Sequence, residues 1–327
     1  MIEMMSTSQS IHSPAKGEDE KEAIILGHCI LNMNTRAPGI AVWEGGIVPV
    51  LRALKRYYGE KHQYPCLEAS VVGMRRWWHV KEQYNTFTFR FLSQRLSQMY
   101  SHHFLRNGIT KVKVLGLGLS PTCGLRYTQS DPTYGGRPRE IDPSRIIKRG
   151  KGVLIEEMDS EFKRAGLDAS ILDVSPSLIY PEYEERISNA GEYPATPYEA
   201  LEEIESFLEV KLAFRDEEIS RISSLKEDIR SKRTLVIPRK LLDTHIDALI
   251  GYAERGVGIT LIEDIYGNEE ERELLSFIYA SMLANMVLAD HSIRIAVGNG
   301  ESDELVESIM EKLEESRILQ KISIRKI

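Results

Sequence analysis

Several features that define common protein classes are missing from this sequence. None of its apolar runs reaches the ~18–20 residues that span a bilayer, so we expect no membrane association. The opening residues, Met1-Ile2-Glu3-Met4-Met5, lack the basic-then-apolar order of a secretory signal, which predicts a cytoplasmic protein. No internal repeat recurs at a fixed period. The composition, with 42% hydrophobic and 28% charged residues, excludes collagen and mainly disordered chains.

Cysteine is scarce. The 327 residues contain only Cys29, Cys66 and Cys123. An odd number in a chain without a secretory signal argues against a disulfide framework. The spacing between the three is too wide for a local zinc knuckle, so any site that they share must be assembled by the fold.

The charge is unevenly distributed along the chain. The formal net charge is −7, but residues 1–20 carry −3, residues 21–170 carry +10 and residues 171–327 carry −14. The basic stretch favours an anionic ligand, a phosphate or RNA. The alternative is that the opposite signs help two domains to dock.

Strand and helix patterns alternate from residue 22 onward. Residues 1–20 are polar and aperiodic, which predicts a disordered arm. The alternation then predicts an α/β fold, with a Rossmann-like parallel sheet domain over residues 22–175. A mostly helical connector follows at 176–233, and a second, smaller α/β domain at 234–327. Strands of the first domain are expected at 23–26, 112–117 and 169–174, with long helices at 47–58, 87–100 and 153–162.

The positions of the cysteines relative to these strands decide whether they can meet. Ligands of parallel sheets bind beyond the carboxyl ends of the strands. Cys29 and Cys123 each follow a predicted strand. Cys66 does so only if residues 62–65 form the intervening strand. If residues 67–72 form it instead, Cys66 lies at the wrong end and the three thiols cannot meet.

Three thiolates permit more than one site. They can bind a 4Fe–4S cluster through three of its irons and leave the fourth iron open. A zinc site with His28 or His79 as a further ligand is the competing metal site. The third alternative is that the cysteines are small buried hydrophobic residues. His102 and His103, on the long helix, are expected at the surface or in the core and not as ligands.

Four short motifs add to this picture. They are Gly27-His28-Cys29-Ile30-Leu31-Asn32, Cys66-Leu67-Glu68 with Gly73 and Arg75 or Arg76 after it, Ser120-Pro121-Thr122-Cys123-Gly124, and Gly150-Lys151-Gly152-Val153 leading to Met158. Together they resemble the 2-thiouracil desulfurase family over residues 22–175. The chain departs from the family pattern at Leu67, where the family has proline.

The resemblance implies a 4Fe–4S cluster on Cys29, Cys66 and Cys123, with the sulfur of a thiolated pyrimidine on the open iron. It also implies that Glu68 and Ser120 assist cleavage of the C–S bond as catalytic residues. We expect substrate contacts from residues near these motifs, namely Asn32, Arg36, Arg75, Trp78 and Thr122.

The sequence therefore predicts an iron–sulfur-dependent desulfurase that acts on a small thiolated heterocycle. Two alternatives remain open at this point. One is a sulfur-transfer enzyme that thiolates RNA or a metabolite, and the other is a non-enzymatic, metal-containing binding module.

Overall fold

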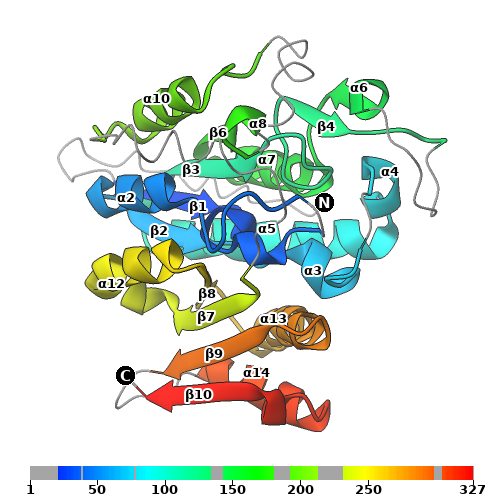
Figure 1. The fold of residues 1–327 in the computed structure, drawn as a ribbon, viewed down its shortest axis with the longest axis vertical. Coiled ribbons are helices and arrows are strands. Elements are labelled where there is room, and N and C mark those ends of the chain that lie inside the picture. The colour runs from blue at the N-terminus through cyan, green and yellow to red at the C-terminus, as the bar shows by residue number, and fades with distance from the viewer. Residues whose placement is uncertain are drawn as a thin grey trace, which may run out of the picture.

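The computed structural model describes residues 21–37, 40–76, 79–133, 143–179, 192–212, 231–297 and 304–326. Within them the chain forms two four-stranded parallel sheets, the upper and lower parts of Figure 1, and a small antiparallel hairpin. Helices flank both sheets. This confirms the predicted α/β class with a Rossmann-like parallel sheet and a second α/β unit. The arm expected at residues 1–20 lies outside the described residues.

The N-terminal sheet aligns the ends of its strands. Leu26 pairs with Gln63 on one side and with Leu115 on the other, so three neighbouring strands end at the same edge. Ile24 packs in one core layer and Ile25 in the opposite one, as the two-residue period of a strand requires. The strands, in spatial order, are β2 (Glu60–Gln63), β1 (Lys21–Leu26), β3 (Ile109–Leu117) and β6 (Asp168–Val174).

Helices cover both faces of this sheet. One core layer contains α2 (Val48–Arg56), α8 (Pro176–Ile179) and α10 (Pro197–Leu208). The opposite layer contains α3 (Leu67–Val71), α5 (Phe87–Arg106) and α7 (Val153–Ala165). The connecting segments contain short elements: α1 (His28–Leu31), η1 (Met33–Thr35), α4 (Lys81–Tyr84), α6 (Pro143–Ile146) and the hairpin of β4 (Tyr127–Gln129) with β5 (Ile147–Arg149).

The C-terminal sheet repeats the topology of the first. When the strands of each sheet are numbered in chain order, their spatial order from one edge to the other is second, first, third, fourth in both sheets. Every pairing within the two sheets is parallel. The strands of the C-terminal sheet are β7 (Arg233–Pro238), β8 (Val257–Ile262), β9 (Ser292–Val297) and β10 (Ile322–Lys326), and its helices are η4 (Arg239–Leu241), α12 (Leu242–Glu254), α13 (Glu269–Leu288), α14 (Glu304–Glu315) and η5 (Leu319–Lys321).

The two sheets meet where β2 and β8, the second strand of each, form their edges. The helices follow the same correspondence, because α2 packs on α12 and α3 packs on α13. At this joint between the β2 and β8 edges, the Gln63 side chain makes hydrogen bonds to the backbone of β8 of the kind that a neighbouring strand would make. Its Nε2 donates to the Ile259 carbonyl at 3.0 Å, and its Oε1 accepts from the Leu261 amide at 2.7 Å. The two core layers therefore continue from one sheet into the other.

Ion pairs also cross this joint. Basic side chains of α2 and β2 face acidic side chains of α12 at 2.5–2.7 Å. These pairs favour the interpretation that the basic charge of the N-terminal stretch helps it to dock on the acidic C-terminal unit. The pairs are Arg52 with Glu254, Lys55 with Asp247 and Lys61 with Asp243.

The structure decides between the two strand alternatives of the sequence. The strand before Cys66 is β2, close to the expected residues 62–65, and the alternative strand at 67–72 is wrong because Leu67–Val71 is helix α3. The β4–β5 hairpin was not predicted, since its strands have three residues each and lie in a segment rich in glycine and proline. No helix in the described ranges is long and apolar enough to cross a membrane.

Replacing Gln63 with alanine is expected to destabilise the protein by at least about 2 kcal/mol. The reason is that the backbone amide of Leu261 and the backbone carbonyls of His28 and Ile259 would lose their hydrogen-bond partner. The measurement is the free energy of unfolding in urea. Gln94→Ala, at an exposed position of α5, is the control and should change stability by less than about 0.5 kcal/mol. Equal denaturation midpoints for the two variants would contradict the role given to Gln63.

Candidate functional site

The three cysteines lie beyond the carboxyl ends of three neighbouring strands. Cys29 follows β1 within α1, Cys66 precedes α3 after β2, and Cys123 lies in the loop after β3. All three line one pocket, whose free space is about 750 Å³ including the part open to solvent. Every residue that lines it comes from the segment 27–154, within the predicted first domain.

The loop that carries Cys123 turns sharply back onto β3. Leu119 has a left-handed backbone with φ of 62°. The Leu117 amide donates to the Cys123 carbonyl at 3.1 Å, which holds the cysteine against the strand. A Cβ on Gly116 would lie 2.2 Å from that carbonyl oxygen, so only glycine permits the contact.

The start of helix α7 holds the same loop from the other side. The amides of Val153 and Leu154 donate to the carbonyls of Pro121 and Thr122 at 3.1 and 3.0 Å. These are amides that have no partner within the helix, and the loop satisfies them. A Cβ on Gly152 would lie 2.3 Å from the Thr122 carbonyl carbon. Gly152 therefore allows the helix to pack directly on the cysteine loop.

Cys66 is buried and Cys29 and Cys123 are half-buried, and neighbouring groups shift the pKa of each thiol. A hydrogen bond with Cys66 lowers the pKa of Cys29 to about 7, against the effect of burial and with the help of the Arg36 guanidinium. The same hydrogen bond, together with burial, raises the pKa of Cys66. Burial raises the pKa of Cys123 to about 12. Ligation of a metal by all three thiolates would therefore release protons.

Glu68 is the centre of a hydrogen-bond network in the same pocket. Its Oε1 accepts from the Thr122 hydroxyl at 2.5 Å, and its Oε2 accepts from Arg76 Nε at 2.9 Å and from the Tyr84 hydroxyl at 3.0 Å. Burial opposes its ionisation, but the charge of Arg76 and these hydrogen bonds outweigh burial and lower the pKa. Glu68 is thus an ionised carboxylate close to the cysteines.

The pocket gathers some of the predicted substrate-binding residues and not others. Arg36 and Thr122 line it. Arg75 does not, because its exposed guanidinium points to Asp290 at 3.6 Å, and the arginine that lines the pocket is Arg76. This corrects the choice between two adjacent arginines. Trp78 lies outside the described residues.

Asn32 also lies away from the pocket, which corrects its expected role. Its amide nitrogen donates to the hydroxyls of Thr234 and Thr260 at 3.2 and 3.0 Å. These threonines belong to β7 and β8, so Asn32 contributes to the joint between the sheets. The motif that continues from Cys29 to Asn32 gives no information about where a neighbouring sheet will pack.

Ser120 lines the pocket, but its hydroxyl is engaged with the cysteine loop. The oxygen accepts hydrogen bonds from the amides of Cys123 at 3.0 Å and Thr122 at 3.3 Å. These contacts fix the loop conformation, as serine hydroxyls often do in turns. The catalytic role expected for Ser120 stays a prediction, whereas its contacts position Cys123.

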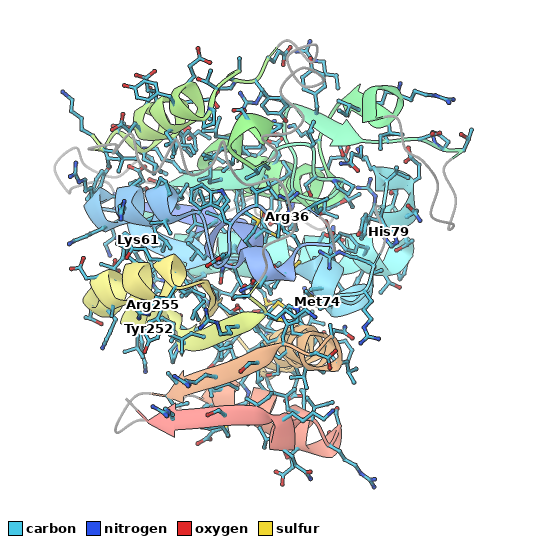
Figure 2. All side chains as sticks on the ribbon, in the orientation of Figure 1. Arg36, Lys61, Met74, His79, Tyr252 and Arg255 are labelled. Atoms are coloured by element: carbon cyan, nitrogen blue, oxygen red, sulfur yellow. The ribbon has the colours of Figure 1, made fainter. Side chains whose placement is uncertain are left out.

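The two histidines considered as further ligands differ. Both ring nitrogens of His28 face threonine hydroxyls, Thr35 at 3.0 Å and Thr260 at 3.1 Å, and burial lowers its pKa to about 3. His79 lines the pocket, and its buried Nδ1 has no hydrogen-bond partner within the described residues. Figure 2 labels Arg36 and His79, which belong to the half of the molecule that carries α3 and α4.

Sequence reasoning missed the walls of the pocket. The aromatic rings of Tyr64, Tyr84 and Phe89 line it, and the Tyr64 hydroxyl faces the Cys123 thiol. They come from the segment after β2 and from α4 and α5. They are 20 and 5 positions apart in the chain and are not part of any motif, so the sequence pattern carried no signal that they share a site.

The comparisons with known proteins leave the family open. The chain is 26% identical over 168 residues to an uncharacterized protein of Methanocaldococcus jannaschii. The alignment covers 50% of this chain and 88% of that protein. No family model matches the chain, and no solved structure does.

Replacing Gly152 with alanine is expected to push the cysteine loop away from α7 and destabilise the protein by about 1–3 kcal/mol. Cys123 should then react faster with a thiol reagent, which mass spectrometry of the labelled peptides measures. Gly251→Ala is the control, since its added Cβ would meet only the end of the Arg255 side chain at 3.4 Å. Unchanged labelling of Cys123 in Gly152→Ala would contradict this account of the loop.

Proposed function

We propose that the protein is an iron–sulfur-dependent desulfurase that removes sulfur from a thiolated nucleobase or a related small thio-compound. The observation that carries the proposal is the pocket itself, where three cysteines from three strand ends lie together with an ionised carboxylate. The resemblance of the surrounding motifs to the 2-thiouracil desulfurase family adds to it. The segment 22–175 is proposed as the catalytic domain.

The donor set fits a 4Fe–4S cluster better than a single zinc ion. Zn–S bonds of about 2.3 Å limit the distance between two sulfurs on one zinc to about 4.6 Å. Within the described residues, the three thiols are not among the groups whose ligand atoms all lie within 4.8 Å of one another. At least one pair of the sulfurs is therefore too far apart for a single zinc ion, whereas a cluster takes each thiolate on a separate iron.

The charges of the site also support a cationic metal core. Three thiolates and Glu68 would carry four negative charges, and Arg36 and Arg76 supply two positive ones in the same pocket. A metal core of two positive charges would neutralise the remainder. Buried charges are stable only when they are balanced in this way.

The proposed reaction is hydrolysis of a thiocarbonyl. The C=S bond of the substrate breaks, a C=O bond forms with the oxygen of water, and the sulfur leaves as sulfide. When bound, the cluster would supply a Lewis-acidic iron that takes the sulfur atom. No external oxidant or reductant is needed.

The residues of this chain have separate roles in that reaction. A carboxylate has room for four hydrogen bonds, so Glu68 can accept one more from a water or from a ring N–H of the substrate. Thr122 and Arg76 hold its two oxygens in place. Tyr84 and Phe89, with ring centroids 5.1 Å apart, supply an aromatic wall for a planar heterocycle.

A small substrate is favoured over RNA because several of the basic side chains have partners within the fold. Those of α2 pair with α12, and Lys151, close to the pocket loop, pairs with Asp159 at 2.6 Å. A sulfur-transfer enzyme for RNA would need such cations for phosphates.

Anaerobically purified or reconstituted protein is expected to contain iron and sulfide in equal amounts and to absorb near ~400 nm, as thiolate-bound clusters do. Cys123→Ser should lose this absorbance. A colourless protein that retains zinc and resists reconstitution would contradict the cluster and the desulfurase together.

Glu68→Gln is expected to retain the cluster and to release sulfide from 2-thiouracil at least about 100-fold more slowly, because a positioned carboxylate contributes about 10²–10⁴-fold. Sulfide is measured against iron content, which separates lost chemistry from lost cofactor. Glu270→Gln, exposed on α13, should match the wild type. Normal turnover in Glu68→Gln would remove this residue from its role.

A further inference from the structure

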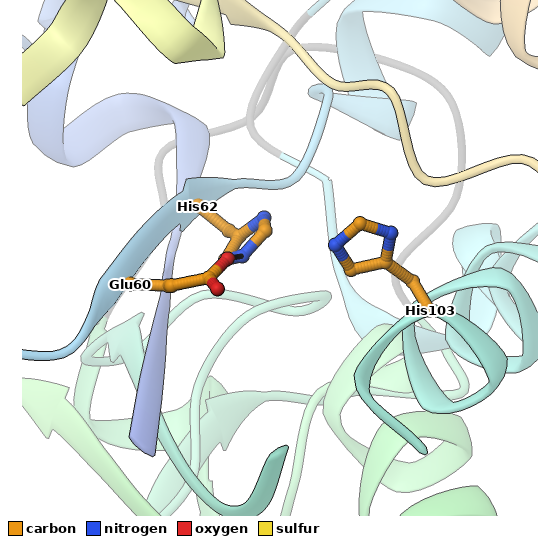
Figure 3. Close-up of side chains that lie close together, drawn as sticks. All are labelled: Glu60, His62 and His103. Carbon is orange, nitrogen blue, oxygen red and sulfur yellow. Dashed lines mark ion pairs between the residues drawn. The ribbon is translucent and has the colours of Figure 1, made fainter. Parts of the chain in front are cut away.

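A second polar cluster lies at the joint between the sheets, apart from the cysteine pocket. Figure 3 shows Glu60 and His62 of β2 and His103 of α5 pointing toward one another. Within the described residues, these three side chains form the group of metal-binding type whose ligand atoms all lie within 4.8 Å. Glu60 Oε2 lies 3.5 Å from His62 Nε2, close to the ligand–ligand distance of about 3.3 Å around a tetrahedral zinc ion.

His62 has the hydrogen bonding of a metal ligand. Its Nδ1 lies 2.7 Å from Glu263 Oε2, and its Nε2, on a fully buried ring, has no hydrogen-bond partner within the described residues. Metal-binding histidines ordinarily donate one ring N–H to a carboxylate and present the other nitrogen to the ion. The second oxygen of Glu263 accepts a hydrogen bond from the backbone N–H of Gln63 at 2.7 Å, so this carboxylate is fixed in position.

The Tyr100 hydroxyl, a second buried polar atom near His62, also lacks a hydrogen-bond partner in the described part of the chain. Its ring centroid lies 6.0 Å from that of His62. Buried polar atoms in native proteins are usually satisfied by protein, water or an ion. The open Nε2 of His62 and this hydroxyl therefore indicate that a further group completes the cluster.

The charge balance indicates the sign of that group. Glu60, Glu263 and Asp264 bring three negative charges, and Arg239, within 4 Å of all three, brings one positive charge. With neutral imidazoles the cluster carries two negative charges. A divalent cation neutralises it.

We propose that Glu60, His62 and His103 bind a divalent transition-metal ion of the zinc type at the joint between the two sheets. Two imidazoles and one carboxylate form a ligand set for such ions. Glu60 is 40% exposed and leaves a route for the ion from solvent. The site ties β2 and α5 together, and through Glu263 it also ties them to the end of β8. It is independent of the cysteines and of the proposed desulfurase.

Cobalt(II) is the probe that distinguishes this site from the thiols, because thiolate ligation gives an intense near-ultraviolet band and His/carboxylate ligation does not. The metal-free full-length protein is titrated with Co²⁺ without oxygen. We expect one equivalent with weak visible bands and no thiolate band. His103→Ala should lose this equivalent, whereas His102→Ala, the exposed neighbour on the same helix, should keep it.

Two further variants distinguish loss of a metal ligand from misfolding of His103→Ala. Glu60→Gln, at the half-exposed position, should weaken binding by at least about 100-fold. Glu263→Gln should weaken it by about 10–100-fold, because Glu263 fixes the orientation of the His62 ring. Zn²⁺ should raise the melting temperature of the wild type and not that of Glu60→Gln. Equal Co²⁺ binding by wild type and Glu60→Gln, or no thiolate-free equivalent in the wild type, would overturn the proposal and leave a protonated His62 between Glu60 and Glu263.

Discussion

The alignment of three parallel strand ends is the constraint on which the rest of this structure depends. Because Leu26 pairs with both Gln63 and Leu115, the segments after β1, β2 and β3 leave the sheet at one edge. Thiols that are 37 and 57 positions apart in the chain therefore line one pocket. Glycines 116 and 152 then let β3 and α7 approach the Cys123 loop more closely than any side chain would permit.

The C-terminal half supports this arrangement without lining the pocket. Helix α3 carries Glu68 directly after Cys66, and α13 packs on it. Asn285 of α13 donates to the carbonyls of Ala69 and Ser70 at 2.9 and 3.2 Å. With Gln63 bonded to β8, both ends of the Cys66 segment are held by the C-terminal unit, one by its sheet and one by α13. Two units of equal topology thus meet edge to edge, and one stabilises the site of the other.

The sequence predicts the sheet, the long helices and the positions of the cysteines because these follow from apolar periodicity and strand order. It does not decide between Arg75 and Arg76, since adjacent residues in a turn point in different directions that only packing fixes. Asn32 and His103 show a related limit. Asn32 contacts Thr234 of the second sheet, so its surroundings depend on how the two sheets dock. His103 contacts His62 of β2, so its surroundings depend on how α5 packs on the first sheet.

The central claim is that three cysteines hold a cluster with one iron left for substrate. Mössbauer spectroscopy of iron-enriched protein, recorded with and without 2-thiouracil, tests it most directly. The account predicts that the added thio-compound changes the signal of about one quarter of the iron, the share of a single site in a 4Fe–4S cluster. A spectrum in which no iron responds, or in which the bound iron is not part of a cluster, would contradict it.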